Sequence, residues 1–270
     1  MKKISLLVFG AALFLSSCSD DPSTKASIKK TTKRTPNIAY TVDAVLAHST
    51  SSFTEGLFVH EGQLIESTGS PEYFPETKSV YGVVDSNGTI QAVNELPKQY
   101  FGEGITALNG KLYQLTYQSK KGFIWDFENG KKLGTFTIPA KEGWGFTNDG
   151  THLIMSDGTE NIRFLNPASL EVEKTIQVKE NGRLVERINE LEYVKGQLYA
   201  NLFMTDLVLR IDPKTGEVNG KMDLSDLKRR ALYEYPKSQE TNGIAYDAEL
   251  DLFYVTGKMW PYTFRIQLLD

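Results

Sequence analysis

Short apolar runs along this chain alternate with turns rich in Gly, Asn and Asp, and one such pattern occurs five times. Each copy places its third residue two positions before an apolar residue. It then continues through a turn into a second apolar run, as a β-hairpin does. The third residues of the five copies, which we call the first column, are Glu55, Glu103, Trp144, Asn189 and Asn242.

The spacing of the first column predicts the architecture. Successive members are 48, 41, 45 and 53 residues apart, and one four-stranded propeller blade takes about 40 to 50 residues. Five copies therefore predict an all-β fold, a five-bladed β-propeller. Because the innermost strand of each blade borders the central channel, the first column is expected to form one ring of side chains around the axis. A hydrogen-bonded polar plug in the channel is the alternative explanation for some of these residues.

Both ends of the propeller chain are needed to close the ring. After Asn242 only 28 residues remain, which suffices for about three strands with their turns. An alternating segment over Ile38–Leu46 can supply the fourth strand, so that ring closure by an N-terminal strand leaves no open edge. The propeller domain is therefore expected to cover residues 37–270. One helix is expected, over Ser225–Tyr233 with Ser225 as its N-cap, as an insertion on the face that borders a site.

Residues 1–36 are not expected to belong to the fold. Residues 1–18 have the layout of a secretory signal peptide, and Leu15-Ser16-Ser17-Cys18 resembles the lipobox of bacterial lipoproteins. Cys18 would then carry a lipid that attaches the protein to the bacterial cell envelope, on its periplasmic or outer-membrane face. An ordinary signal peptide with an incidental cysteine is the alternative. Residues 19–36 are polar and rich in Lys, Ser and Thr, which predicts a flexible tether.

Composition limits the partners and the chemistry. The chain has 270 residues, 40% of them hydrophobic and 24% charged, and a net charge of -4. Without a basic cluster in the propeller, this balance argues against nucleic acid as a partner, and we expect a monomer that meets the membrane only through the lipid on Cys18. No two of the three histidines, His48, His60 and His152, have metal-ligand spacing. Catalysis would therefore depend on carboxylates, amides and a lysine.

A second set of positions lies one hairpin further along, fourteen residues after the first column and sixteen in the last copy. We call it the second column, and its members are Gly69, Tyr117, Gly158, Phe203 and Lys258. These residues are expected at the same rim of the channel as the first column. Both columns together would give one channel mouth aromatic walls, amides, carboxylates and one cation, which is the composition of a small-molecule site.

The motifs around both columns resemble those of the glutaminyl-peptide cyclotransferases of plants and bacteria, in the same order from about residue 38 to the C-terminus. They are Phe53-Thr54-x-Gly56-Leu57, Glu66-Ser67-Thr68-Gly69, Phe101-Gly102-Glu103-Gly104, Gly143-Trp144-Gly145, Ser156-Asp157-Gly158-Thr159, Asn189-Glu190-Leu191-Glu192, Asn242-Gly243-Ile244-Ala245 and Val255-Thr256-Gly257-Lys258-x-Trp260. The resemblance implies a five-bladed propeller that converts the N-terminal Gln of peptides and proteins to pyroglutamate with loss of ammonia. It implies no required cofactor and no metal site, and a structural Ca²⁺ in the channel is compatible with the sequence.

The same resemblance implies roles for the site residues. Glu103 would take a proton from the α-amine and return it to the leaving ammonia, and burial among aromatic side chains would raise its pKa. The implied catalytic residues are Glu103, Lys258 and Asn189. The implied substrate-binding residues are Glu55, Tyr117, Trp144, Phe203 and Asn242, of which Asn242 is, with Lys258 and Asn189, a candidate to hold the developing oxyanion. Plant members carry Gln in place of Glu55 and Trp in place of Tyr117 and Phe203, so a wider and more acidic cavity is expected here.

Two other functions fit a propeller of this kind. A surface lipoprotein could use the same face to bind a ligand without catalysis, and a sugar lactonase would use a bound metal ion, because fold alone does not determine function. Single residues also have structural alternatives. Glu103 would be a channel carboxylate satisfied by amides, Lys258 would neutralise a carboxylate through a salt bridge, and Trp144 would close the channel.

Overall fold

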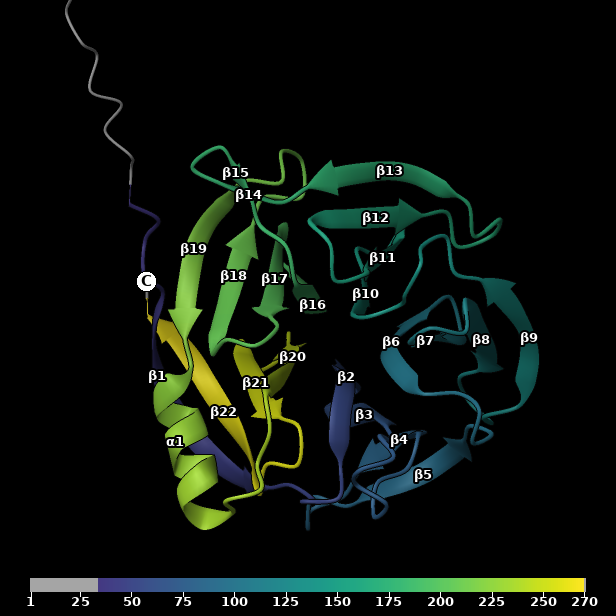
Figure 1. Ribbon diagram of the computed structural model, residues 1–270, viewed down its shortest axis with the longest axis horizontal. Coiled ribbons are helices and arrows are strands. Elements are labelled where there is room, and N and C mark those ends of the chain that lie inside the picture. Colours follow the sequence, from purple (N-terminus) through teal and green to yellow (C-terminus); the bar gives the residue numbers. More distant parts are fainter. Residues whose placement is uncertain (1–33, 270) are drawn as a thin grey trace, which may run out of the picture. The chain divides into compact units, whose positions relative to one another are not determined.

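The computed structural model describes residues 34–269. Within them, five four-stranded antiparallel sheets surround a central axis (Figure 1), which is the predicted five-bladed propeller. The expected signal peptide and the lipid-bearing Cys18 lie outside the described residues, as does most of the expected tether. The last tether residues contact the propeller, since the Thr35 hydroxyl donates to Glu180 (2.5 Å) and the Pro36 carbonyl accepts the N–H of Lys221 (2.9 Å).

Each of the first four blades runs in chain order from its inner to its outer strand, and neighbouring inner strands contact one another around the ring. The first two blades contain β2 (Phe53–His60), β3 (Gln63–Gly69), β4 (Val80–Val84) and β5 (Ile90–Glu95), then β6 (Gly102–Leu108), β7 (Lys111–Thr116), β8 (Lys121–Asp126) and β9 (Lys132–Thr137). The next two contain β10 (Phe146–Asn148), β11 (Leu153–Ser156), β12 (Asn161–Leu165) and β13 (Val172–Gln177), then β16 (Ile188–Val194), β17 (Gln197–Leu202), β18 (Leu207–Ile211) and β19 (Val218–Asp223). A short hairpin of β14 (Lys179–Glu180) and β15 (Arg183–Leu184) connects these two blades.

The fifth blade joins the two ends of the propeller chain. It contains β20 (Thr241–Asp247), β21 (Leu252–Gly257), β22 (Tyr262–Leu269) and, on its outer edge, β1 (Ala39–Ala47). β1 pairs antiparallel with β22 from Ala39 opposite Leu269 to Ala47 opposite Tyr262. The N-terminal strand is thus the fourth strand of the last blade, and the edge of β22 is paired.

Apolar side chains pack between blades, whereas the channel is polar. Phe58 and Ile65 of the first blade, for example, pack against Ile105 of the second. In the channel, the fully buried Glu190 accepts the N–H groups of Leu57 (3.3 Å) and Ile244 (2.9 Å) from two other inner strands. Because buried backbone donors need partners, this carboxylate, next to Asn189 of the first column, stabilises the inner ring.

The helix α1 (Ser225–Glu234) lies between β19 and β20 and packs through Leu227 and Ala231. The predicted N-cap is wrong: Leu224 occupies that position and makes no side-chain cap hydrogen bond. The reason is burial, because Leu224 is fully buried in the same core cluster. The helix does not line the cavity described below. Within residues 34–269, no helix has the length and apolar character needed to cross a membrane.

The inner strand of the third blade begins at Phe146, two residues after the first-column residue Trp144. The Trp144 carbonyl accepts the N–H of Gly104 from the second blade (2.8 Å). Trp144 is therefore held by the neighbouring blade as well as by its own, and it lies in the segment that leads into β10.

Candidate active site

A local irregularity of the inner strands positions the first column. Four of the five inner strands shift their pairing register at the column residue. Such a β-bulge inserts an extra residue and re-aims its side chain. The residues at these shifts are Glu55 in β2, Glu103 in β6, Asn189 in β16 and Asn242 in β20.

In four of the five copies a glycine follows the column residue, and it lets neighbouring inner strands approach closely. A Cβ on Gly104 would lie 2.5 Å from the backbone nitrogen of Phe146 and from the carbonyl oxygen of Trp144. A Cβ on Gly145 would lie 2.2 Å from the carbonyl oxygen of Asn189. The repeated glycine is therefore needed for close packing of the inner strands, and it sets how near the first-column side chains lie to one another.

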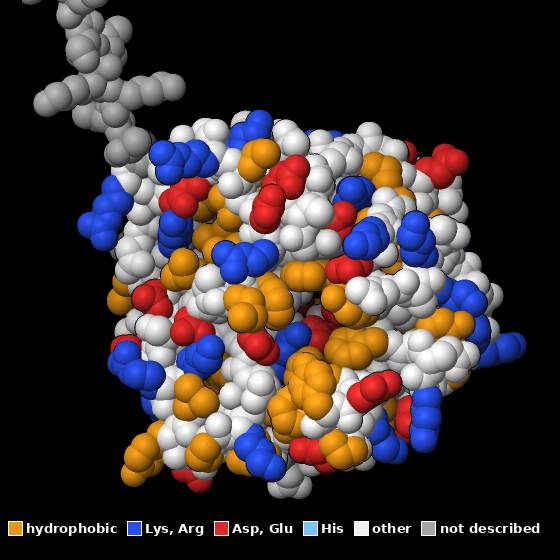
Figure 2. Space-filling model, viewed as in Figure 1, with side chains coloured by type: hydrophobic (Ala, Val, Ile, Leu, Met, Phe, Trp, Pro, Cys, Tyr) orange, Lys and Arg blue, Asp and Glu red, His pale blue; other side chains and the backbone are white. Residues whose placement is uncertain are grey.

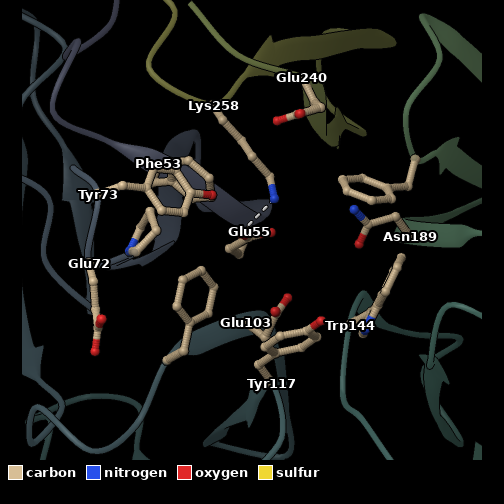
Figure 3. Close-up of a pocket in the computed structure, with 13 residues that line it drawn as sticks. Phe53, Glu55, Glu72, Tyr73, Glu103, Tyr117, Trp144, Asn189, Glu240 and Lys258 are labelled. Carbon is tan, nitrogen blue, oxygen red and sulfur yellow. Dashed lines mark hydrogen bonds and ion pairs between the residues drawn. The ribbon is translucent and has the colours of Figure 1, made fainter.

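The second column lies at the end of the second strand of each blade, as expected: Gly69 is the last residue of β3, and Gly158 comes two residues after β11. Neither glycine lines the cavity described here. Tyr117 follows β7, Phe203 follows β17 and Lys258 follows β21. These side chains and most of the first column surround a cavity of about 410 Å³. Figure 2 shows a hollow at the centre of this face, bordered by hydrophobic side chains, with acidic and basic side chains inside. The lining residues, drawn in Figure 3, are Phe53, Glu55, Pro71, Glu72, Tyr73, Phe101, Glu103, Tyr117, Trp144, Asn189, Phe203, Glu240 and Lys258.

A buried ion pair lies in the middle of the cavity. The Lys258 ammonium donates to Glu55 Oε1 at 2.7 Å, and it also lies 4.6 Å from the centre of the Phe53 ring and 5.6 Å from that of Phe203. Burial alone would lower the pKa of Lys258, but the carboxylates of Glu55 and Glu103 raise it overall. Lys258 is therefore charged. Burial raises the pKa of Glu55 to about 7, against the opposing attraction of Lys258.

Glu103 lies beside this pair and is 5% exposed. Burial raises its pKa well above the ordinary value, and the charge of Glu55 adds to this effect while Lys258 opposes it. A raised pKa brings a carboxyl group into the range where it can both accept and donate a proton near neutrality. The structure thus brings together the predicted residues Glu103, Glu55 and Lys258.

The two predicted amides have different surroundings. Asn189 lines the cavity, and its Oδ1 is buried without a hydrogen-bond partner among the described residues. Asn242 is fully buried and does not line the cavity; its amide donates to the Thr54 carbonyl (2.9 Å) and to Glu55 Oε2 (3.2 Å). Asn189 is thus open to a ligand, whereas Asn242 holds Glu55 in place.

Aromatic rings form the walls around the charged centre. Trp144 and Phe203 meet edge to face with centroids 5.3 Å apart, and the Trp144 Nε1–H donates to Glu142 (3.0 Å). Phe101 lies between Phe53 (6.1 Å) and Tyr117 (6.0 Å). These rings desolvate the carboxylates and offer apolar contact to the stem of a bound side chain.

Comparison with known proteins agrees with this architecture. A family model described as glutamine cyclotransferase matches residues 11–268. This chain belongs to the glutamine cyclotransferase family. A curated relative, the glutaminyl-peptide cyclotransferase of Arabidopsis thaliana, is 35% identical over 229 residues, which make up 84% of this chain and 70% of the relative. The crystal structure of Myxococcus xanthus glutaminyl cyclase is 32% identical and superposes with a TM-score of 0.78, covering 88% of this chain and 100% of that one.

The cavity of this glutamine cyclotransferase family member also includes residues that sequence reasoning missed. Phe53, Phe101 and Glu240 stand at the first position of the repeated pattern, two residues before the first column. The third blade has Glu142 at this position, the partner of Trp144. The first position of the repeated pattern could therefore have identified these residues as part of the cavity lining. Pro71, Glu72 and Tyr73 come from the loop between β3 and β4, to which no repeat points.

Proposed function

We propose that this protein is a glutaminyl-peptide cyclotransferase that acts on peptide and protein N-termini beginning with Gln, with Glu103 as its single proton-transfer group and without a catalytic metal ion. The names of the Arabidopsis and Myxococcus proteins support the activity. The observation that carries the assignment of Glu103 is its environment. Its carboxyl group lines the cavity, is nearly fully buried, has a raised pKa and has no hydrogen-bond partner within residues 34–269.

The proton count of the reaction needs only one such group. As the α-amine nitrogen attacks the side-chain carboxamide carbon, it loses one proton, which the Glu103 carboxylate accepts. When the C–N bond to the amide nitrogen breaks, protonated Glu103 gives that proton to the leaving group, which departs as ammonia. The new lactam bond replaces the carboxamide bond, and Glu103 returns to its ionised form, so one carboxyl group serves as base and then as acid.

The neighbouring groups fit the charge that develops on the carboxamide. The Lys258 ammonium has N–H groups beyond the one bonded to Glu55, and they can donate to the γ-carbonyl oxygen as it becomes negative. Asn189 lines the same cavity, and its unpartnered Oδ1 can accept an N–H of the substrate carboxamide. Trp144 and Phe203 can pack against the methylene groups of Gln and hold the folded conformer in which the amine reaches the carbonyl.

The alternatives make different demands on this site. A metal-dependent lactonase needs a group of metal ligands, and no cluster of three or more His, Cys, Asp or Glu side chains suited to a metal occurs within residues 34–269. A pure ligand-binding propeller does not need an ionisable group at position 103. The proposal and the two alternatives therefore differ in the effect of EDTA and in the effect of replacing Glu103.

The test is ammonia release from a Gln-initiated dipeptide amide by the purified protein, with and without EDTA, beside Glu103→Gln. General acid–base catalysis contributes about 10²- to 10⁴-fold, so the variant should lose turnover by that factor while it keeps the melting temperature of a folded propeller. Loss of activity in EDTA that added metal restores would contradict the metal-free reaction. A folded wild-type protein that releases no ammonia would contradict the activity itself.

A further inference from the structure

We propose that Glu240 makes this site prefer peptides in which a basic residue follows the N-terminal Gln. The inference rests on the proposed function and specifies its substrate class. It starts from a carboxylate that lines the cavity and that the reaction described above does not use.

The backbone around Glu240 is fixed on the rim of the cavity. Its carbonyl accepts the N–H of Lys258 (2.9 Å), and the preceding Gln239 donates its N–H to the Lys258 carbonyl (2.8 Å). The Gln239 carbonyl in turn accepts the indole N–H of the fully buried Trp260 (3.1 Å). The side chain of Glu240, by contrast, makes no hydrogen bond or ion pair with any residue that the structure describes. A rigid backbone thus presents a carboxylate whose acceptor sites are open to a ligand.

The residues that line the cavity carry more negative than positive charge. The lining residues include four carboxyl groups, Glu55, Glu72, Glu103 and Glu240, and one cation, Lys258. Lys258 is bonded to Glu55, and Glu103 exchanges a proton with the substrate amine in the proposed reaction. Lys258 also feels the charge of Glu240, but one cation faces four carboxyl groups among the lining residues, so negative charge is in excess on the Glu240 side of the cavity.

The arrangement in the cavity indicates which part of a peptide Glu240 meets. Figure 3 shows Glu240 and Glu103 on opposite sides of the ion pair of Lys258 and Glu55. The α-amine must lie at Glu103 to exchange its proton, and the side chain of Gln must reach the unpartnered Oδ1 of Asn189. Glu240 therefore faces the chain that follows the Gln, where a Lys or Arg side chain would be attracted and an Asp or Glu side chain repelled.

The test compares kcat/KM for three dipeptide amides, Gln-Lys, Gln-Ala and Gln-Glu, at low salt. A partly buried charge pair and the matching like-charge repulsion together should favour Gln-Lys over Gln-Glu by about tenfold. The effect should appear in KM and not in kcat, because the contact is the same in the ground state and in the transition state. It should shrink in 1 M salt, where the screening length is about 3 Å.

The decisive measurement is the ratio of kcat/KM for Gln-Lys to that for Gln-Glu in the Glu240→Gln variant. This ratio should fall below about threefold, because the substitution removes one charge and keeps the shape of the side chain. Glu72→Gln is the matched comparison. Glu72 is exposed and its carboxylate points away from the ring of side chains in Figure 3, so it should change the ratio less.

Two results overturn the inference and leave the proposed function standing. The first is turnover of all three peptides with a Gln-Lys to Gln-Glu ratio near one, and the second is a tenfold ratio that Glu240→Gln does not change. A ratio unaffected by salt also overturns it, because it would come from shape and not from charge. A folded protein that turns over none of the peptides overturns the proposed function, and this inference with it.

Discussion

Replacing Lys258 with Met tests how the site carries its buried charges. The ammonium lies 2.7 Å from Glu55 Oε1, and the two side chains are only 8% and 2% exposed. Met keeps an unbranched apolar stem of similar length, so the substitution removes a charge and little packing. It leaves the Glu55 carboxyl group buried without its cation, while Asn242 still donates to it.

The magnitude follows from the geometry. Breaking a buried ion pair by removing one partner costs about 3 to 5 kcal/mol, and we expect the lower end at pH 7 because Glu55 can take up a proton instead of remaining charged. The pKa of Glu55 is about 7 in the folded protein against an ordinary 4.5, so the folded state binds more protons between these values and stability falls as pH rises through them. Without Lys258 that window extends above pH 7, with a slope of up to about 1.4 kcal/mol per pH unit.

The assay is urea unfolding between pH 6 and pH 9 of four proteins: wild type, Lys258→Met, Glu55→Gln and the double variant. The double variant removes both charges of this pair, so its unfolding free energy should return to within about 1 kcal/mol of wild type and lose the extra dependence on pH. Equal pH profiles for wild type and Lys258→Met, or additive losses in the double variant, would refute the claim that Glu55 depends on Lys258.

Three further predictions concern the scaffold. Burial lowers the pKa of His48, but Glu66 at 3.1 Å raises it overall. Their ion pair therefore stabilises the fold fully below the ordinary His pKa of 6.5, and this stabilisation is lost as pH rises through the folded pKa of His48. His48→Asn should cost about 1 kcal/mol more at pH 5.5 than at pH 9, measured by urea unfolding. Gly104→Ala places a Cβ 2.5 Å from backbone atoms and should cost at least about 2 kcal/mol and lower kcat/KM. Gly134→Ala is the matched control for Gly104→Ala: its added Cβ meets nothing within 4 Å, and it should stay within about 0.5 kcal/mol of wild type. Asn242→Leu removes both hydrogen bonds of its amide and should cost about 2 kcal/mol, measured by thermal unfolding.

The sequence predicts the ring because its information is local and repeated. Hydrophobic alternation and turn residues locate the inner hairpins, and their spacing gives the number of blades, so residues at equal positions such as Glu55 and Glu103 are correctly placed on one rim. The second column follows from hairpin length, which is why Tyr117 and Lys258 also lie at the cavity.

The features that the sequence does not predict are those set by contacts between blades. The N-cap at Leu224 is set by burial against the fifth blade, and the position of Trp144 depends on a hydrogen bond from Gly104 of the neighbouring blade. Whether Asn189 or Asn242 faces the cavity depends on what each amide meets across the ring. Both are Asn at the same position of a repeat, and only the partners differ.

The geometry that makes the ring useful also opposes the ionised state of its acids. Burial raises the pKa of Glu190 well above its ordinary value and that of Glu192 to about 8, as it does for Glu55 and Glu103. Each such group holds its proton more tightly in the folded state, so folding stability falls as pH rises from about 4.5 to about 8. Catalysis by Glu103 needs the ionised form as its starting base. The propeller therefore stabilises the protonated form of Glu103, in which the proposed base is inactive. A rise in pH should increase turnover and decrease the unfolding free energy. Hydrogen bonds from neighbouring strands to Glu190 and the ion pair at Glu55 limit that loss.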